Sequence, residues 1–279
     1  MANMTTRVHG DGFGSQFNCM ISAILSCQTL GNQFYHTPIK SLVLDNDPNP
    51  QNQDLVRANA MIDDYISDLG FRNATEEDNC QGLGFYDCGI YANPEAYYTD
   101  ANLNFLKSWK RIPESVFYKQ GEFNIAIHIR RGDDVVDPRH LQCRIISFDL
   151  YDSIIQNLRK TFPEANIHIF CWGTPELKNA DEKTFFHLVD NGGYFLDHFI
   201  AMIQADVLVV GSSSFSFSAG FLNKNVVICD DLIFRLNDMP LPPEWKLNYK
   251  KYIENVWGAL WIKIQKSTLL GIMVLLVLL

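Results

Sequence analysis

The residues best suited to chemistry follow an apolar stretch near the middle of the chain. Residues 125–134 read IAIHIRRGDD, which places His128, Arg130 and Arg131 at or near the carboxyl end of a predicted buried strand. Two adjacent arginines are costly to desolvate without an anion, and a guanidinium fork matches phosphate oxygens. Alternate strand residues point to opposite faces, so His128 and Arg130 should share a face and Arg131 should point away. The pattern favours a phosphate site over its alternative, a surface turn with solvated charges.

A second candidate is the serine loop, ADVLVVGSSSFS at residues 205–216. A strand is expected to end at Gly211, and a helix is expected to begin after the serines. Backbone N–H groups at a helix N-terminus form an anion site when hydroxyls stand beside them. The alternative interpretation is that Ser213 or Ser214 only caps the helix.

A third candidate is a glycine turn near the N-terminus, with Gly10, Gly12 and Gly14 between a predicted strand and a predicted helix. This context resembles a dinucleotide fingerprint, but Ser15 occupies the third glycine position. Asp45 lies farther downstream than the ~20 residues expected for a ribose-binding acid. The glycine turn leaves a nicotinamide-dependent oxidoreductase as an alternative function. That alternative has the wrong spacing to the acid and also leaves the two arginines unexplained.

Composition narrows the classes of function. The net charge of −9 argues against a protein that binds nucleic acid, because such proteins need a basic face. The seven cysteines show no zinc spacing, which predicts that no structural metal is bound. Cys80 and Cys88 bracket a glycine-rich loop, and the spacing leaves a local disulfide open.

The elements that must position these residues alternate between strands and helices. The N-terminal part is expected to hold strands at 4–8 and 41–44 and helices starting at the glycine turn, at Asp54 and near Thr99, with an irregular segment from Asn73 to Asn93. From residue 124 onward, strands are expected at 124–129, 167–170, 207–210 and 226–228, and helices at 148–162, 195–204 and 215–222. This order predicts an α/β fold of two Rossmann-like halves facing a cleft. The expected boundaries are residues 1–120, 121–250 and 251–279.

The C-terminal segment Ser267–Leu279, STLLGIMVLLVLL, carries no charge. Thirteen helical residues would span about 20 Å, against roughly 30 Å of bilayer hydrocarbon. The segment is open to three interpretations: a short membrane tail, an apolar helix packed on the domain, or a truncated span. No N-terminal signal peptide is visible, so the sequence favours a protein that is cytoplasmic or membrane-associated through this tail.

At this point three segments together resemble one superfamily. HIRRGD resembles the arginine motif of α1,2-, α1,6- and protein O-fucosyltransferases. GDGFGSQF is similar to their N-terminal glycine motif, and FLDHFIAMIQADVLVVGSSSFS to their C-terminal helix, strand and serine segment. The similarity runs from about Val8 to Ile228, and in particular the sequence resembles the α1,2-fucosyltransferase-like group. Four positions depart from the family pattern: Ser15 and Gly211 replace asparagines, and Phe217 and Ser218 replace tryptophans.

The resemblance implies a GT-B-type fold, with an acceptor-side N-terminal domain and a GDP-sugar-binding domain after it. It also implies an inverting transfer of fucose from GDP-fucose to a glycan hydroxyl, without a metal or other cofactor. The roles implied for single residues are donor binding by His128, Arg130, Arg131, Asp133, Ser213, Ser214 and Ser216, and a turn beside the reacting centre formed by Gly12, Gly14 and Gln16.

The resemblance further implies that Arg130 bonds the diphosphate and stabilises the departing GDP. A general base would accept the proton of the acceptor hydroxyl. Asp11, Asp134 and Asp137 are the candidates. Asp137 is favoured by its place in the loop after the arginines, where α1,6-type enzymes carry an acid one position later, at the position of Pro138 in this sequence. The alternative to a transferase is a catalytically inactive nucleotide-sugar-binding protein of the same fold.

Overall fold

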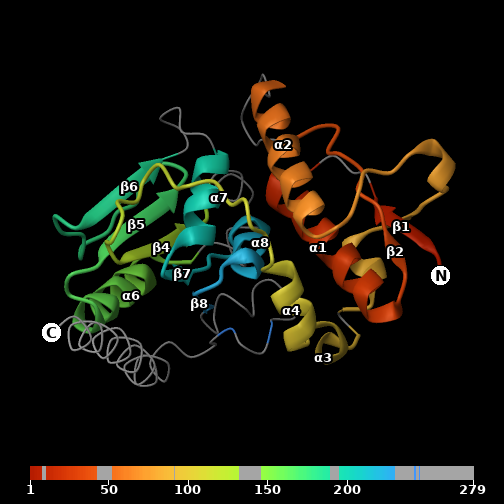
Figure 1. The fold of residues 1–279 in the computed structure, drawn as a ribbon. Coiled ribbons are helices and arrows are strands. Elements are labelled where there is room, and N and C mark those ends of the chain that lie inside the picture. Colours follow the sequence, from red (N-terminus) through yellow and green to blue (C-terminus); the bar gives the residue numbers. More distant parts are fainter. Residues whose placement is uncertain are drawn as a thin grey trace, which may run out of the picture.

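The chain forms two parallel β-sheets with helices packed on them (Figure 1). This computed structural model describes residues 1–7, 11–42, 52–90, 92–131, 146–188, 195–229, 242 and 245. All pairings between the named strands are parallel, and helices connect most of them, as expected for α/β units. The predicted α/β fold of two Rossmann-like halves is confirmed, whereas the boundaries at residues 120 and 250 stay a prediction.

The first sheet has three short strands in the order β2-β1-β3. Their bounds are Asn3–Thr6 for β1, Gln33–Phe34 for β2 and Gln81–Leu83 for β3. The helices of this half are α1 (Phe13–Leu30), α2 (Asn52–Asp68), α3 (Pro94–Tyr97) and α4 (Asp100–Leu106), with 3-10 turns η1 (Glu76–Asp78) and η2 (Phe85–Cys88). Helix α1 is buried over most of its length, because it lies between this sheet and the second half of the molecule.

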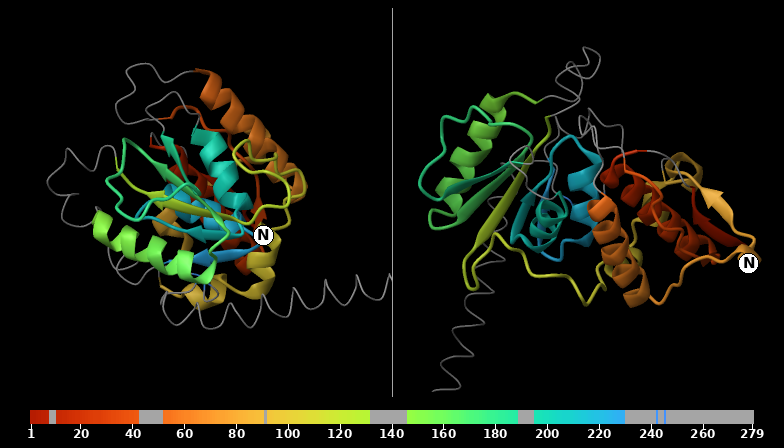
Figure 2. Two further views of the ribbon diagram at one scale, coloured as in Figure 1. Left: turned by 90° about the vertical axis from the view of Figure 1, so that its left-hand side faces the viewer. Right: turned by 90° about the horizontal axis from the view of Figure 1, so that it is seen from above.

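The second sheet has five strands in the order β6-β5-β4-β7-β8. The strands are β4 (Asn124–Ile129), β5 (Asn166–Cys171), β6 (Thr184–Leu188), β7 (Val207–Val209) and β8 (Val226–Ile228), and the helices are α6 (Phe148–Thr161), α7 (Phe195–Gln204) and α8 (Ser214–Leu222). Figure 2 shows α6 on the outer face of the sheet and α7 and α8 on the face toward the first half. Strand β4 is central and apolar, so its carboxyl end is held rigidly.

The two halves meet where α1 crosses α8. A Cβ on Gly14 would lie 2.4 Å from the Cα of Phe215, so the two helices approach closely enough to require glycine. Phe13, Phe17 and Phe199 form a ring cluster there with centroids 5.1–5.4 Å apart. The hydroxyl of Ser218 donates to the carbonyl of Gly14 at 3.0 Å. The two halves therefore share one continuous apolar core.

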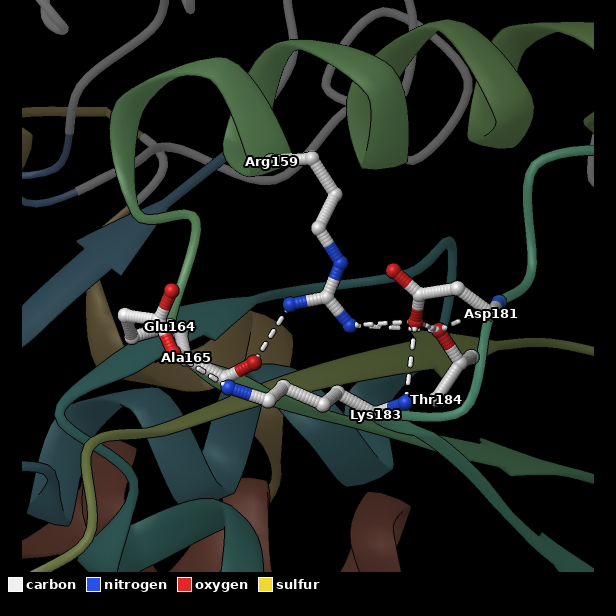
Figure 3. Close-up of polar contacts among 6 residues, drawn as sticks. All are labelled: Arg159, Glu164, Ala165, Asp181, Lys183 and Thr184. Carbon is white, nitrogen blue, oxygen red and sulfur yellow. Dashed lines mark hydrogen bonds and ion pairs between the residues drawn. The ribbon is translucent and has the colours of Figure 1, made fainter.

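A partly exposed ion pair and its hydrogen bonds hold the amino-terminal end of the second sheet (Figure 3). Arg159 on α6 donates to the carbonyl of Ala165 and, at 2.7 Å, to the carboxylate of Asp181. Asp181 also accepts from the hydroxyl of Thr184 at 2.7 Å and from the backbone N–H of Lys183 at 3.1 Å. The network ties helix α6 to the turn that begins edge strand β6.

The structure differs from the sequence-based expectations at four places. Instead of a strand at 41–44, the strand beside β1 is β2 at Gln33–Phe34, and Leu42 makes only an isolated bridge to Asp11; residues 43 and 44 lie outside the described part. The segment 73–93 contains β3, whose regularity comes from pairing with β1 and not from a local pattern. Strand β6 was not expected, and it is likewise defined by its pairing with β5. Cys80 and Cys88 are separate thiols, so the local disulfide is absent.

Candidate functional site

The carboxyl end of β4 and the start of α8 form one polar site. His128 and Arg130 reach the same loop, as their alternation along the strand predicts. The Nδ1 atom of His128 lies 2.9 Å from the hydroxyl of Ser216, and Nη1 of Arg130 donates to the hydroxyl of Ser213 at 3.0 Å. The arginine motif and the serine loop are thus brought together, although about eighty residues separate them in the chain.

Ser213 is the N-cap of α8. Its hydroxyl accepts from the backbone N–H of Phe215 at 3.3 Å and also receives the Arg130 bond. Capping alone would leave the arginine contact unexplained. Ser213 therefore joins a guanidinium to the positive end of a helix, which is an arrangement suited to an anion.

Ser216 is fully buried and holds the loop in shape. The backbone N–H of Gly211 donates to its hydroxyl at 3.1 Å, while the hydroxyl lies 3.3 Å from the carbonyl of Ser213. Because the hydroxyl is shared with His128, Ser216 supports the loop from within. Ser214 is partly exposed at the first position of α8.

Gly211 allows the loop to press against β4. A Cβ at this position would lie 2.5 Å from the carbonyl oxygen of His128 and 3.0 Å from its Nδ1. Real Cβ atoms do not approach a backbone oxygen so closely, so a side chain would push the loop away from the strand. This contact gives a reason why glycine stands here in place of the asparagine common in the resembling family.

Arg131 points away from the serine loop. Its guanidinium donates to the carbonyls of Arg130 at 2.7 Å and Ile146 at 3.0 Å, and it stacks 4.2 Å from the ring of Phe148. Arg131 thus fixes the backbone just after β4 and the start of α6. In this geometry it positions Arg130, whereas a direct anion contact would need its side chain to turn.

Electrostatics keep His128 neutral. Burial lowers its pKa to about 3, and the positive charge of Arg130 and the nearby His198 add to the effect. A neutral imidazole can accept or donate one hydrogen bond to Ser216 without adding charge. The positive charge of the site therefore comes from Arg130 and the α8 N-terminus.

The glycine turn lies on the other side of the α1–α8 crossing. Gly12 is the N-cap of α1, and its backbone N–H donates to the carboxylate of Asp11 at 2.7 Å. The buried amide of Gln16 donates to the carbonyls of Asp11 at 2.7 Å and Ser41 at 2.8 Å. Gln16 therefore braces the turn, and Gly14 serves the helix crossing.

Several predicted features lie outside the described residues, namely Asp133, Asp134, Asp137 and the tail Ser267–Leu279. Within the described ranges, no group of three or more His, Cys, Asp or Glu side chains could hold a metal ion. In that same part of the chain, no helix is long and apolar enough to cross a membrane.

Comparison with known proteins gives structural neighbours only. No protein-family model matches the sequence, and no curated protein matches it. The structural neighbours are fucosyltransferases. The fucosyltransferase NodZ from Bradyrhizobium is 11% identical, with a TM-score of 0.38, over 80% of this chain and 94% of that one. A NodZ α-1,6-fucosyltransferase structure soaked with GDP-fucose gives 12% identity and a TM-score of 0.37, over 80% of this chain and 93% of that one. A NodZ α-1,6-fucosyltransferase structure co-crystallised with GDP gives 13% identity and a TM-score of 0.37, over 80% of this chain and 93% of that one.

The sequence analysis missed two features, one at the serine loop and one in the first half of the molecule. The role of Gly211 depends on a neighbouring strand, and the only available signal was a glycine at the end of an apolar run. It also missed His36, which the structure buries in the first half with no hydrogen bond to either ring nitrogen. A lone histidine after a short strand carries no recognisable pattern.

Proposed function

We propose that this protein is an inverting glycosyltransferase that transfers fucose from GDP-fucose to a hydroxyl of a glycan, with an α1,2-fucosyltransferase-like specificity. The observation that carries the proposal is the bond from Arg130 to Ser213 at the N-terminus of α8. It unites a guanidinium and a helix N-terminus, two groups that bind phosphate oxygens. The resemblance of the three sequence motifs supplies the identity of the sugar nucleotide.

The reaction needs a stabilised leaving group. The acceptor oxygen would attack the anomeric carbon as the bond from that carbon to the β-phosphate oxygen breaks, and GDP would depart. Positive charge preorganised at the diphosphate lowers the barrier, because negative charge develops there in the transition state. Arg130 and the first turn of α8 would supply that charge, so we propose that the reaction requires no metal.

The acceptor hydroxyl must lose a proton as it attacks. We propose Asp137 as the general base, since it follows the arginines along the chain and the resembling family carries an acid nearby. Its carboxylate would take the proton directly from the acceptor hydroxyl. The alternative, an inactive nucleotide-sugar-binding protein, shares the donor site but would form no product.

The test compares Arg130→Lys and Arg130→Ala with the parent protein. GDP binding by calorimetry and fucose transfer from GDP-fucose, with and without EDTA, are the measurements. We expect Arg130→Ala to lose roughly 3 kcal/mol or more of transition-state stabilisation, and Arg130→Lys to be poor because an ammonium lacks the fork. Transfer by the parent should persist in EDTA.

Three outcomes would contradict parts of the proposal. Activity of Arg130→Ala close to that of the parent would refute the role of Arg130. GDP binding without product from any acceptor would favour the inactive binding protein. Loss of transfer in EDTA that Mn²⁺ or Mg²⁺ restores would refute metal independence.

A further inference from the structure

A small pocket in the first half of the molecule is lined by residues of β1, α1 and α2 and by the segment that follows β2. Its polar walls come from Thr6 at the end of β1, His36 just after β2 and Gln16 on the first turns of α1, together with Thr37 and Arg7, whose guanidinium is paired with Asp87. Residues such as Phe17 and Ile62 form its apolar walls. Ligands of parallel α/β sheets bind beyond the carboxyl ends of the strands. The pocket occupies that position in the first sheet.

Within the part of the chain that the structure describes, three buried polar atoms at this pocket have no hydrogen-bond partner. They are both ring nitrogens of His36 and the hydroxyl oxygen of Thr6. His36 is 2% exposed and Thr6 is 8% exposed. An unsatisfied buried polar group costs about 1–3 kcal/mol, so three at one cavity indicate a site whose partner comes from outside the chain.

The chemistry of the pocket favours a neutral hydroxyl group. Burial lowers the pKa of His36 to about 4, although the negative charge of Asp63 raises the pKa and opposes part of this effect. The ring is therefore neutral near pH 7. A neutral imidazole has one nitrogen that donates and one that accepts, and the two point away from each other, so a single group can pair with only one of them. A hydroxyl both donates and accepts, so it can pair with whichever ring nitrogen faces the pocket and also with a second hydroxyl such as that of Thr6. A carboxylate could not pair with a nitrogen that accepts, and an ammonium could not pair with one that donates.

The dimensions limit how a ligand enters. The space open to a water-sized group is about 20 Å³, which is enough for one water molecule or one hydroxyl. A whole sugar ring does not fit, but one edge of it would. The walls formed by Phe17, Met20 and Ile39 suit the C–H groups beside that hydroxyl.

Along α1, the residues that line the pocket lie within one helical turn of the contact with α8. Gln16 and Phe17 line the pocket, while Gly14 of the same helix touches Phe215 at the start of α8. Ser213, two residues before Phe215, receives the Arg130 bond. A turn of helix rises about 5.4 Å, so groups bound at the two places would be neighbours.

We propose that this pocket is an acceptor subsite, in which His36 and Thr6 bind one non-reacting hydroxyl of the sugar that receives the fucosyl group. This inference rests on the proposed function. It makes His36 and Thr6 residues that recognise the acceptor, and it assigns them no part in the bond-breaking step.

The test is Thr6→Val with Thr5→Val as the matched control. Both changes replace a hydroxyl by a methyl group on adjacent residues of β1. The Thr5 hydroxyl is already paired with Thr37 at 2.6 Å and lies outside the pocket lining, whereas that of Thr6 has no partner. His36→Phe, which keeps an aromatic ring and removes both nitrogens, is the second test variant.

We would measure GDP affinity and the melting temperature of each variant. We would also measure KM and kcat for the best acceptor in a panel of methyl glycosides (galactoside, glucoside, mannoside and N-acetylglucosaminide). We expect Thr6→Val and His36→Phe to raise the acceptor KM about tenfold or more and to leave GDP affinity unchanged. Thr6→Val should melt no lower than the parent, because it removes an unpaired hydroxyl. Thr5→Val should leave the acceptor KM unchanged.

The same glycosides would be titrated into protein labelled with ¹⁵N-histidine, and we expect the ring signals of His36 to shift at saturating sugar. Normal acceptor KM in both Thr6→Val and His36→Phe would overturn the inference and assign the cavity to an ordered water. Unchanged His36 signals during sugar binding would do the same. If GDP itself fails to bind the parent protein, the proposed function fails, which is a separate result.

Discussion

At the scale of single residues, the geometry of the candidate site depends on Gly211, a residue that has no side chain. Gly211 brings the serine loop against β4, so that Ser213 and Ser216 meet Arg130 and His128. The catalytic geometry we propose is therefore set by the absence of a Cβ as much as by the charged groups. A bound diphosphate would gain nothing from Arg130 if the loop stood farther away.

This gives the first prediction. Gly211→Ala should weaken GDP binding and lower the melting temperature, because its Cβ would lie 2.5 Å from a backbone oxygen that cannot turn aside. Overpacking of this kind costs about 1–3 kcal/mol. Gly82→Ala is the control, since its nearest contact would be 3.4 Å. Equal GDP affinity in Gly211→Ala and the parent would show that the loop moves without consequence.

At the scale of elements, the crossing of α1 and α8 aligns the two halves. The start of α8 carries the Ser213 cap, and the start of α1 carries the glycine turn and one wall of the His36 pocket. A shift of either helix would move the proposed donor and acceptor positions relative to each other. The closeness of this crossing is set at Gly14.

The second prediction concerns that crossing. Gly14→Ala should destabilise the protein by about 1–3 kcal/mol, because its Cβ would fall 2.4 Å from both the Cα and the backbone nitrogen of Phe215. Ser15→Ala changes the next position of α1, which is only partly buried, and is the control. Urea unfolding of both variants measures the difference. A Gly14→Ala midpoint equal to that of the control would contradict the close-packed crossing.

A third prediction concerns the ion pairs at the other end of the second sheet. Arg159→Met should destabilise by about 1–3 kcal/mol, because the carbonyl of Ala165 and the carboxylate of Asp181 lose a mostly buried donor. Lys178→Met is the control. Its pair with Asp149 is exposed at both ends, and such pairs contribute about 0–1 kcal/mol. Equal unfolding midpoints for the two variants would mean that the network in Figure 3 adds little.

At the scale of the whole molecule, five histidines are held in their neutral form. Burial lowers the pKa of His36, His168 and His187 to about 4, and of His128 and His198 to about 3. The Nδ1 atom of His168 lies 2.9 Å from Nε2 of His187. The rings of His187 and His198 both pack against the ring of Phe117. Protonation of any of these rings in the folded state would bring positive charge into an apolar or already cationic setting.

The fourth prediction is the resulting pH dependence. Unfolding restores an ordinary histidine pKa near 6.5, so the unfolded chain binds more protons than the folded one between about pH 6.5 and pH 4. Stability should therefore be greatest above about pH 6.5 and should fall as the pH is lowered through this window. Thermal melts above about pH 4.5, before carboxylates titrate, measure the effect. His187→Gln should flatten the slope, and a melting temperature independent of pH would contradict the account.

The sequence by itself determined the central strand, the helices with strong apolar faces and the residue types of the donor site. Strand β4 and helices α6 and α7 follow from local patterns, because a buried strand or an amphipathic helix shows its period in a few adjacent residues. Composition and order were enough to place the two arginines and the serine loop at strand ends, whereas the structure showed that Arg130 contacts the loop and that Arg131 points away. These inferences depend on neighbours in the chain.

Only the tertiary structure decided the features that depend on distant neighbours. The strands β2, β3 and β6 are defined by pairing with β1 or β5, and no apolar run or alternation in the sequence marks them. The sequence predicted that Arg131 points away from Arg130, but not that the carbonyl of Ile146 is its partner. The ring nitrogens of His36, which have no partner among the described residues, were equally invisible. Packing brings together segments far apart in the chain, and the free energy of a close approach or a buried polar atom exists only once both partners are in place.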